Sequence, residues 1–171
     1  MNVKAVFAST PVLERLRAET RPQHHAIETA LELTSDTLTL GTYRQTLARF
    51  HGLYRPLEGG VQAVGGWADR GRDLVGRWKP PPLESDLRAL GEDDPAALPL
   101  CTDLLPHATV AAACGCLGVG YGDRTGKNGA GVPGDAHCFC GTPCDQDEIV
   151  SAAKDTSLKL HPWIETGASH Q

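Results

Sequence analysis

The stretch "YRQTLARFHGLYRPLEGGV", from Tyr43 to Val61, carries the clearest structural signal in this sequence. Its apolar side chains recur at alternating steps of four and three residues, which places them along one face of an α-helix. These side chains are Tyr43, Leu47, Phe50, Tyr54, Leu57 and Val61. Thr42 with Gln45 forms a capping box at the start, and Gly59 and Gly60 mark the expected end. The stripe predicts one helix of a bundle core.

The preceding segment predicts another helix, because Thr10 suits an N-cap and Pro11 suits the first helical position. One face of it repeats at steps of three and four, through Leu13, Leu16, Thr20, His24, Ile27 and Leu31. Pro22 interrupts this pattern, and an interior proline costs about 3 kcal/mol. We therefore expect a kink there, with Thr20 able to cap the chain again.

The remaining segments also read as helices. The prolines after Lys79 predict a break, followed by a short helix that carries Leu83, Leu87 and Leu90 and ends at Gly91. A weak helix is expected over 71–79, an apolar pattern returns over 110–117, and helical periodicity returns over 145–164. Residues 118–144 are rich in glycine and lack apolar periodicity. The sequence predicts a single all-α domain over residues 1–171, with an atypical segment at 118–144.

The composition limits the classes of protein to which this chain can belong. The chain has 171 residues, of which 40% are hydrophobic and 22% charged, as expected of a globular domain. A formal net charge of −5 argues against nucleic acid as the main partner. No apolar run approaches the roughly 18 residues of a membrane span, and the first residues do not resemble a secretory signal. We expect a cytoplasmic protein, in which the six cysteines need not form disulfides.

Two adjacent histidines in "ETRPQHHAIETAL" (Glu19–Leu31) raise the question of a ligand site. His24 lies on the apolar stripe, and His25 is turned about 100° away from it. A lone histidine on such a face is commonly a core residue, so both readings stay open. Glu28 lies one turn beyond His24, where it could orient a ligating ring. No cysteine or second histidine stands nearby at metal-binding spacing, so haem, which needs one axial histidine, fits better than zinc.

Several segments resemble the bacterial, biliverdin-producing heme oxygenase family. "LRAETRPQHHAIE" is similar to the proximal helix of that family, with its pattern T-x-x-x-H-x-x-x-E. "YRQTLARFHGLYRPLE", "GRWKPPPLESDLRALG", "LLPHATVAAACGCL" and "DEIVSAAKDTSLKLHPWIE" resemble later segments, in the same order. The resemblance implies that His24 ligates the haem iron, that Glu28 or a water orients its ring, and that Arg17 contacts a propionate.

The chain departs from the family after Leu117, where a glycine-rich distal helix is expected. "YGDRTGKN" resembles a later family segment, which would mean that the distal helix is missing between Leu117 and Tyr121. A rival alignment sets "GDRTG" against the "GDLSG" of other heme oxygenases and makes Asp123 the distal, catalytic aspartate.

The following island, "GAGVPGDAHCFCGTPC", also has two readings. It offers four possible zinc ligands, His137, Cys138, Cys140 and Cys144, although the paired C-x-x-C spacing is lacking. Alternatively it reflects a shifted reading frame, because codons for Val132–Phe139 read one base later can encode an apolar helical string.

The resemblance implies a heme oxygenase, with haem as both cofactor and substrate. Such an enzyme uses O2 and electrons from a ferredoxin or reductase to form biliverdin, carbon monoxide and ferrous iron. A bacteriophytochrome would be a partner that takes the biliverdin. Two other functions remain open: a degenerate haem-binding protein that lacks catalysis, and a helical protein with a Cys/His zinc site.

Overall fold

The computed structural model describes residues 11–31, 36, 38–65, 67, 78–104, 108–121 and 143–166. All regular elements among these residues are helices, so the all-α prediction is confirmed. They are α1 (Pro11–Leu31), α2 (Leu40–Ala63), α3 (Pro80–Ala89), the 3-10 helix η4 (Pro95–Ala97), α4 (Val110–Tyr121) and α5 (Pro143–Thr166). In this part of the chain no helix is long and apolar enough to cross a membrane.

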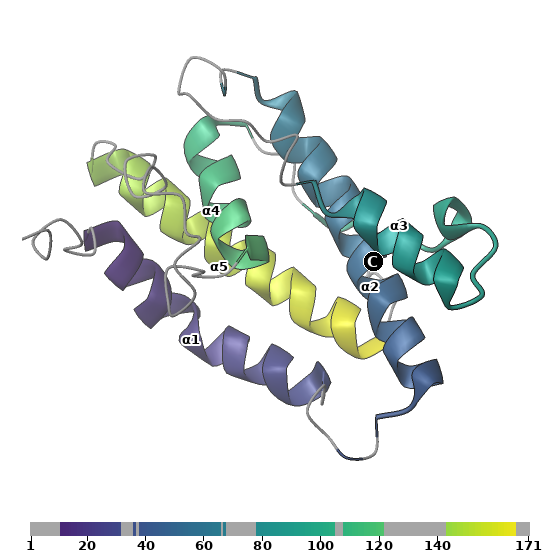
Figure 1. Cartoon of the computed structure of the whole chain (residues 1–171). Helices are drawn as coiled ribbons and strands as arrows, with labels where there is room; N and C mark the ends of the chain where they lie inside the picture. The colour runs from purple at the N-terminus through teal and green to yellow at the C-terminus, as the bar shows by residue number, and fades with distance from the viewer. Residues whose placement is uncertain are drawn as a thin grey trace, which may run out of the picture.

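Helix α5 is the centre of the arrangement, with α1 and α4 packed extensively against it (Figure 1). Helix α2 contacts α4 and α5 and carries α3 on its other side. The helices α1 and α5 run side by side in the same direction (Figure 1). Their ion pairs show this direction: Arg15 pairs with Asp147, and Glu19, later in α1, pairs with Lys154, later in α5. The core joins side chains from α1, α2, α4 and α5, including Leu16, Ile27, Leu53, Val61, Ala113, Ile149, Ala153 and Trp163.

The start and end of α2 differ from the sequence prediction. Thr39, three residues before the predicted cap, is the N-cap, and its hydroxyl accepts from the Thr42 N–H at 3.1 Å. Thr42 is inside the first turn, so its assignment as the cap was wrong. The helix also continues through Gly59 and Gly60 to Ala63, because Leu57 and Val61 on either side are buried in the core. Packing therefore outweighs the low helix propensity of two glycines.

A glycine and a proline inside α2 create a slot for a distant segment. Pro56 has no N–H, so the Gly52 carbonyl one turn earlier loses its usual helical partner. That carbonyl accepts from the Cys101 N–H at 2.9 Å instead. Because Gly52 has no side chain, the Pro99 backbone and the Trp163 ring approach it closely; an added Cβ would lie 2.6 Å from Trp163 Cζ2. The segment around residues 99–101 is thereby fixed to α2.

Helix α1 continues through Pro22 rather than ending there. Thr20 does not cap a second helix, because its hydroxyl donates to the Leu16 carbonyl within the same helix at 2.7 Å. Figure 1 shows the axis of α1 changing direction part-way along, as expected where a proline removes a backbone hydrogen bond.

Helix α3 begins three residues earlier than its apolar side chains suggest. Prolines occupy its first three positions, where a missing N–H costs nothing because those donors have no partner within the helix. Its end matches the prediction: Gly91 has a φ of 85°, and the Glu92 N–H donates to the Leu87 carbonyl. This is a Schellman motif, which favours glycine at the left-handed position.

Candidate functional site

The structure places His24 at the border between the buried and exposed faces of α1. Leu16, Thr20 and Ile27 are buried, His24 is half-buried and His25 is exposed. The sequence phase that separated the two histidines therefore agrees with their exposure. An imidazole at such a border is held by its helix and can still be reached by a ligand.

Arg17 and Glu28 share the side of α1 that carries His24. They lie seven residues before it and four residues after it, and both are exposed. These spacings correspond to nearly whole turns, so the three residues are within about 20° of one line along the helix. The helix thus brings together the three residues that the resemblance singled out. Asp123, the fourth predicted site residue, lies outside the described residues.

The ligand chemistry around His24 restricts which metal group it could hold. No group of three or more His, Cys, Asp or Glu side chains that could hold a metal ion occurs among the described residues. The iron of haem carries its own four ring ligands and needs one axial imidazole from the protein. His24 fits that requirement, since one accessible imidazole is enough. Of the predicted zinc ligands, His137, Cys138 and Cys140 are outside the described residues, and Cys144 falls in the first turn of α5.

Ion pairs fix α1 against α5 beside this site. Arg15 Nη1 lies 2.8 Å from Asp147 Oδ1, and Lys154 Nζ lies 3.1 Å from Glu19 Oε2. The hydrogen bond from Lys154 lowers the pKa of Glu19, and the hydrogen bond to Asp147 raises the pKa of Arg15. These contacts are solvent-exposed, so they set the register of the two helices more than they stabilise the fold.

A buried thiol and a buried hydroxyl meet where α4 packs against α5. Cys116 Sγ lies 2.9 Å from Thr156 Oγ1, and both side chains are buried. Burial raises the pKa of the Cys116 thiol to about 11. A thiol held in its neutral form is a poor nucleophile and a poor metal ligand, so Cys116 belongs to the core rather than to a reactive site.

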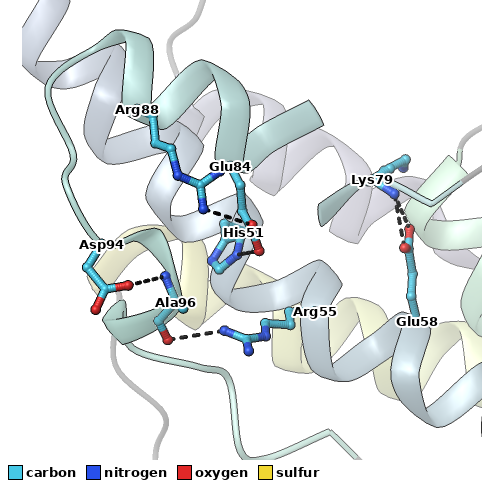
Figure 2. Close-up of polar contacts among 8 residues, drawn as sticks. All are labelled: His51, Arg55, Glu58, Lys79, Glu84, Arg88, Asp94 and Ala96. Atoms are coloured by element: carbon cyan, nitrogen blue, oxygen red, sulfur yellow. Dashed lines mark hydrogen bonds and ion pairs between the residues drawn. The ribbon is translucent and has the colours of Figure 1, made fainter. Parts of the chain in front are cut away.

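A second polar cluster, between α2 and α3, has His51 at its centre (Figure 2). The His51 side chain is fully buried, and its Nε2 lies 3.2 Å from Glu84 Oε1. The other oxygen of Glu84 lies 3.3 Å from Arg88 Nη2. Sequence reasoning left His51 without a role. The sequence feature that could have indicated a role is a polar stripe on α2, which is formed by His51, Arg55 and Glu58 at steps of four and three residues.

The other members of this stripe bind backbone groups on the same side of α2. Both oxygens of Glu58 accept from the Lys79 N–H, at 3.0 and 3.3 Å, just before α3 begins (Figure 2). Arg55 Nη1 donates to the Ala96 carbonyl at 3.1 Å. The Lys79 ammonium lies 3.9 Å from the centre of the Tyr54 ring, a cation–π contact. The stripe therefore attaches α3 and η4 to α2.

The chemistry available to the His51 cluster is limited. His51 Nε2–H can donate to the ionised Glu84 carboxylate, which assigns the tautomer. Its Nδ1 is buried and has no hydrogen-bond partner among the described residues. The contact of the ring with Glu84 joins α2 to α3, which is a structural role.

The comparisons with known proteins add no family assignment. No family model, no curated protein and no solved structure matches this chain.

Proposed function

We propose that this chain is a haem-binding protein of the heme oxygenase type, with His24 as the axial ligand of the iron. The observation that carries the proposal is the position of His24, which is half-buried on α1 between a buried stripe and solvent. The T-x-x-x-H-x-x-x-E pattern that surrounds it supports the same assignment. The protein would be cytoplasmic.

Each residue of the α1 site would have a distinct part in binding. His24 would present a neutral imidazole nitrogen to the iron. Glu28, one turn later, is placed to accept a hydrogen bond from the other ring nitrogen, directly or through water. Arg17, two turns earlier, would offer its guanidinium to a propionate carboxylate. Bound haem would supply the oxygen chemistry that yields biliverdin, carbon monoxide and iron, with electrons from a ferredoxin or reductase.

The activity of the chain depends on whether its sequence after Leu117 forms the distal side of the haem pocket. If Asp123 and its flanking glycines form the distal motif, this residue would act catalytically and haem turnover would be efficient. If the distal helix is missing, one face of the haem would be open, and bound oxygen would lack both polar partners and shielding from water. In that case we expect weak binding, slow turnover and a tendency to aggregate.

A single experiment separates these activities. Hemin is titrated into the full chain, the visible spectrum is recorded, and a reductant and oxygen are then added under single-turnover conditions. A Soret band followed by biliverdin supports the oxygenase, with a bacteriophytochrome as a candidate acceptor. A Soret band without biliverdin supports the degenerate haem-binding protein. The absence of a Soret band, together with stoichiometric zinc in the purified protein, would replace both with the zinc-site alternative.

A further inference from the structure

Helix α3 has a small apolar attachment to the rest of the molecule. Of its ten residues, Pro80 and Leu87 are the two that are buried. A helix of this length is marginal in water by itself, so its stability must come from contacts with neighbouring elements. Leu83 is half-buried as well, so the apolar contact of α3 is small and polar contacts with α2 contribute to its docking.

Two carboxylates provide these polar contacts, one at the start of the helix and one near its middle (Figure 2). Glu58 of α2 binds the Lys79 N–H at the start of α3 through both of its oxygens. Glu84 of α3 accepts from His51 of α2 near the middle. Both contacts are strongest with an ionised carboxylate as acceptor, because protonation removes the negative charge and converts one of the two oxygens into a donor.

Trp67, before α3 in the chain, and residues 96–101 after it are held by contacts that involve neither carboxylate. Before it, the Trp67 indole donates to the Val61 carbonyl at 2.9 Å. After it, Arg55 holds the Ala96 carbonyl and the Gly52 carbonyl holds the Cys101 N–H. These anchors would keep Trp67, Ala96 and Cys101 in place if α3 left α2.

We propose that α3 is a detachable element: its docking on α2 is controlled by the charge of Glu58 and Glu84, and it releases as a unit while the other helices stay folded. The element consists of residues 79–92, from the Lys79 contact to the end of the Schellman motif. Local opening of this kind is expected where few apolar contacts hold a segment to its neighbours.

The expected direction of pH dependence follows from Glu84. Its hydrogen bond with His51 lowers its pKa below the ordinary 4.5. A carboxylate with a lowered folded pKa contributes docking stability above the unfolded value, and this stability is lost as the pH falls through the folded value. The charged and titratable groups in contact on this side of α2, α3 and η4 include Tyr54, which lies under the Lys79 ammonium, and those drawn in Figure 2: His51, Arg55, Glu58, Lys79, Glu84, Arg88 and Asp94.

Hydrogen exchange of the full chain tests the proposal, with rates corrected for intrinsic exchange at each pH. As the pH is lowered from neutral through 4.5, the ordinary value for Glu84, to about 3, the α3 amides should lose protection before the α5 amides do. Glu84→Gln should speed exchange of the α3 amides roughly three- to tenfold at neutral pH, with α5 unchanged. Asp86→Asn is the matched control, because Asp86 is an exposed carboxylate on the same helix.

Equal exchange free energies for α3 and α5 at every pH would overturn the proposal, since α3 would then open only with the whole fold. An Asp86→Asn variant that speeds exchange of the α3 amides as much as Glu84→Gln does would also overturn it, because the faster exchange would then come from the charge of the helix and not from its docking on α2. If Glu84→Gln does not fold, the pH series on the unmodified chain decides between the two outcomes.

Discussion

Gly115 is the position where one methyl group should disturb this fold most clearly. A Cβ built there would lie 3.0 Å from the Ile149 carbonyl carbon, closer still to its oxygen, and 3.1 Å from the Ala152 Cβ. Ordinary van der Waals contact at such a site begins at 3.4 Å. The nearest atoms belong to the α5 backbone and cannot rotate away, so Gly115→Ala requires α4 and α5 to separate.

The size of the effect follows from two opposing terms. Overpacking against a rigid backbone costs on the order of 3 kcal/mol, and replacing a helical glycine by alanine returns up to about 1 kcal/mol. Gly115→Ala should therefore lower the free energy of unfolding by about 2 kcal/mol, or the Tm by about 4–8 °C in a chain of this size. Gly59→Ala is the matched control, because no atom lies within 4 Å of its built Cβ.

Thermal and urea unfolding followed by circular dichroism at the helical band provide the assay. Gly59→Ala should raise the free energy of unfolding by up to about 1 kcal/mol, so the two identical substitutions should have opposite signs. Equal stability of the two variants would refute the close approach of α4 to α5.

Three further predictions concern the core and its ionisable groups. Gly52→Ala should destabilise the chain by about 2 kcal/mol or more and alter the near-ultraviolet signal of Trp163, because its methyl group would meet the Pro99 backbone and that ring; a stable variant with an unchanged spectrum would argue against the slot. Cys116, with a pKa of about 11, should resist alkylation at mildly basic pH until the chain is unfolded, as read from the mass of its peptide; rapid native labelling would contradict its burial. Because the pKa values of Glu19 and Glu84 are lowered, the urea midpoint should fall as the pH drops below their ordinary value of 4.5, and a midpoint that rises there would reverse the assigned signs.

The periodic helices of this chain were accessible from sequence because each buries part of a stripe with helical spacing. On α2, Leu57 and Val61 of the predicted stripe are buried, whereas Tyr43 at its start is exposed. The α5 prediction, 145–164, falls inside the observed Pro143–Thr166, and the stripe through Ala153 and Leu160 is buried. The helix ends were less predictable. Thr39 and Thr42 are both good caps, and in the structure the Thr39 hydroxyl caps the helix, which begins at Leu40.

Contacts between distant segments could not be predicted from the sequence. The Gly52 slot depends on Pro56 freeing a carbonyl that Cys101 then binds, and the partner is far away in the chain. His51 likewise meets Glu84 through the docking of α3. The polar stripe on α2 gave a local hint of such a role, but its partners come from tertiary packing. For the α1 site, the phase of His24 and His25 was predictable because both lie on one regular helix.

The central claim is that His24 ligates haem, and a hemin titration of three forms of the chain tests it most directly. The unmodified chain and His25→Ala should both give the Soret and visible bands of histidine-ligated haem, because His25 is exposed and turned away. His24→Ala should lose those bands, and added imidazole should restore them by supplying the missing ligand. A His24→Ala variant with an unchanged spectrum, together with loss of the bands in His25→Ala, would contradict the assignment.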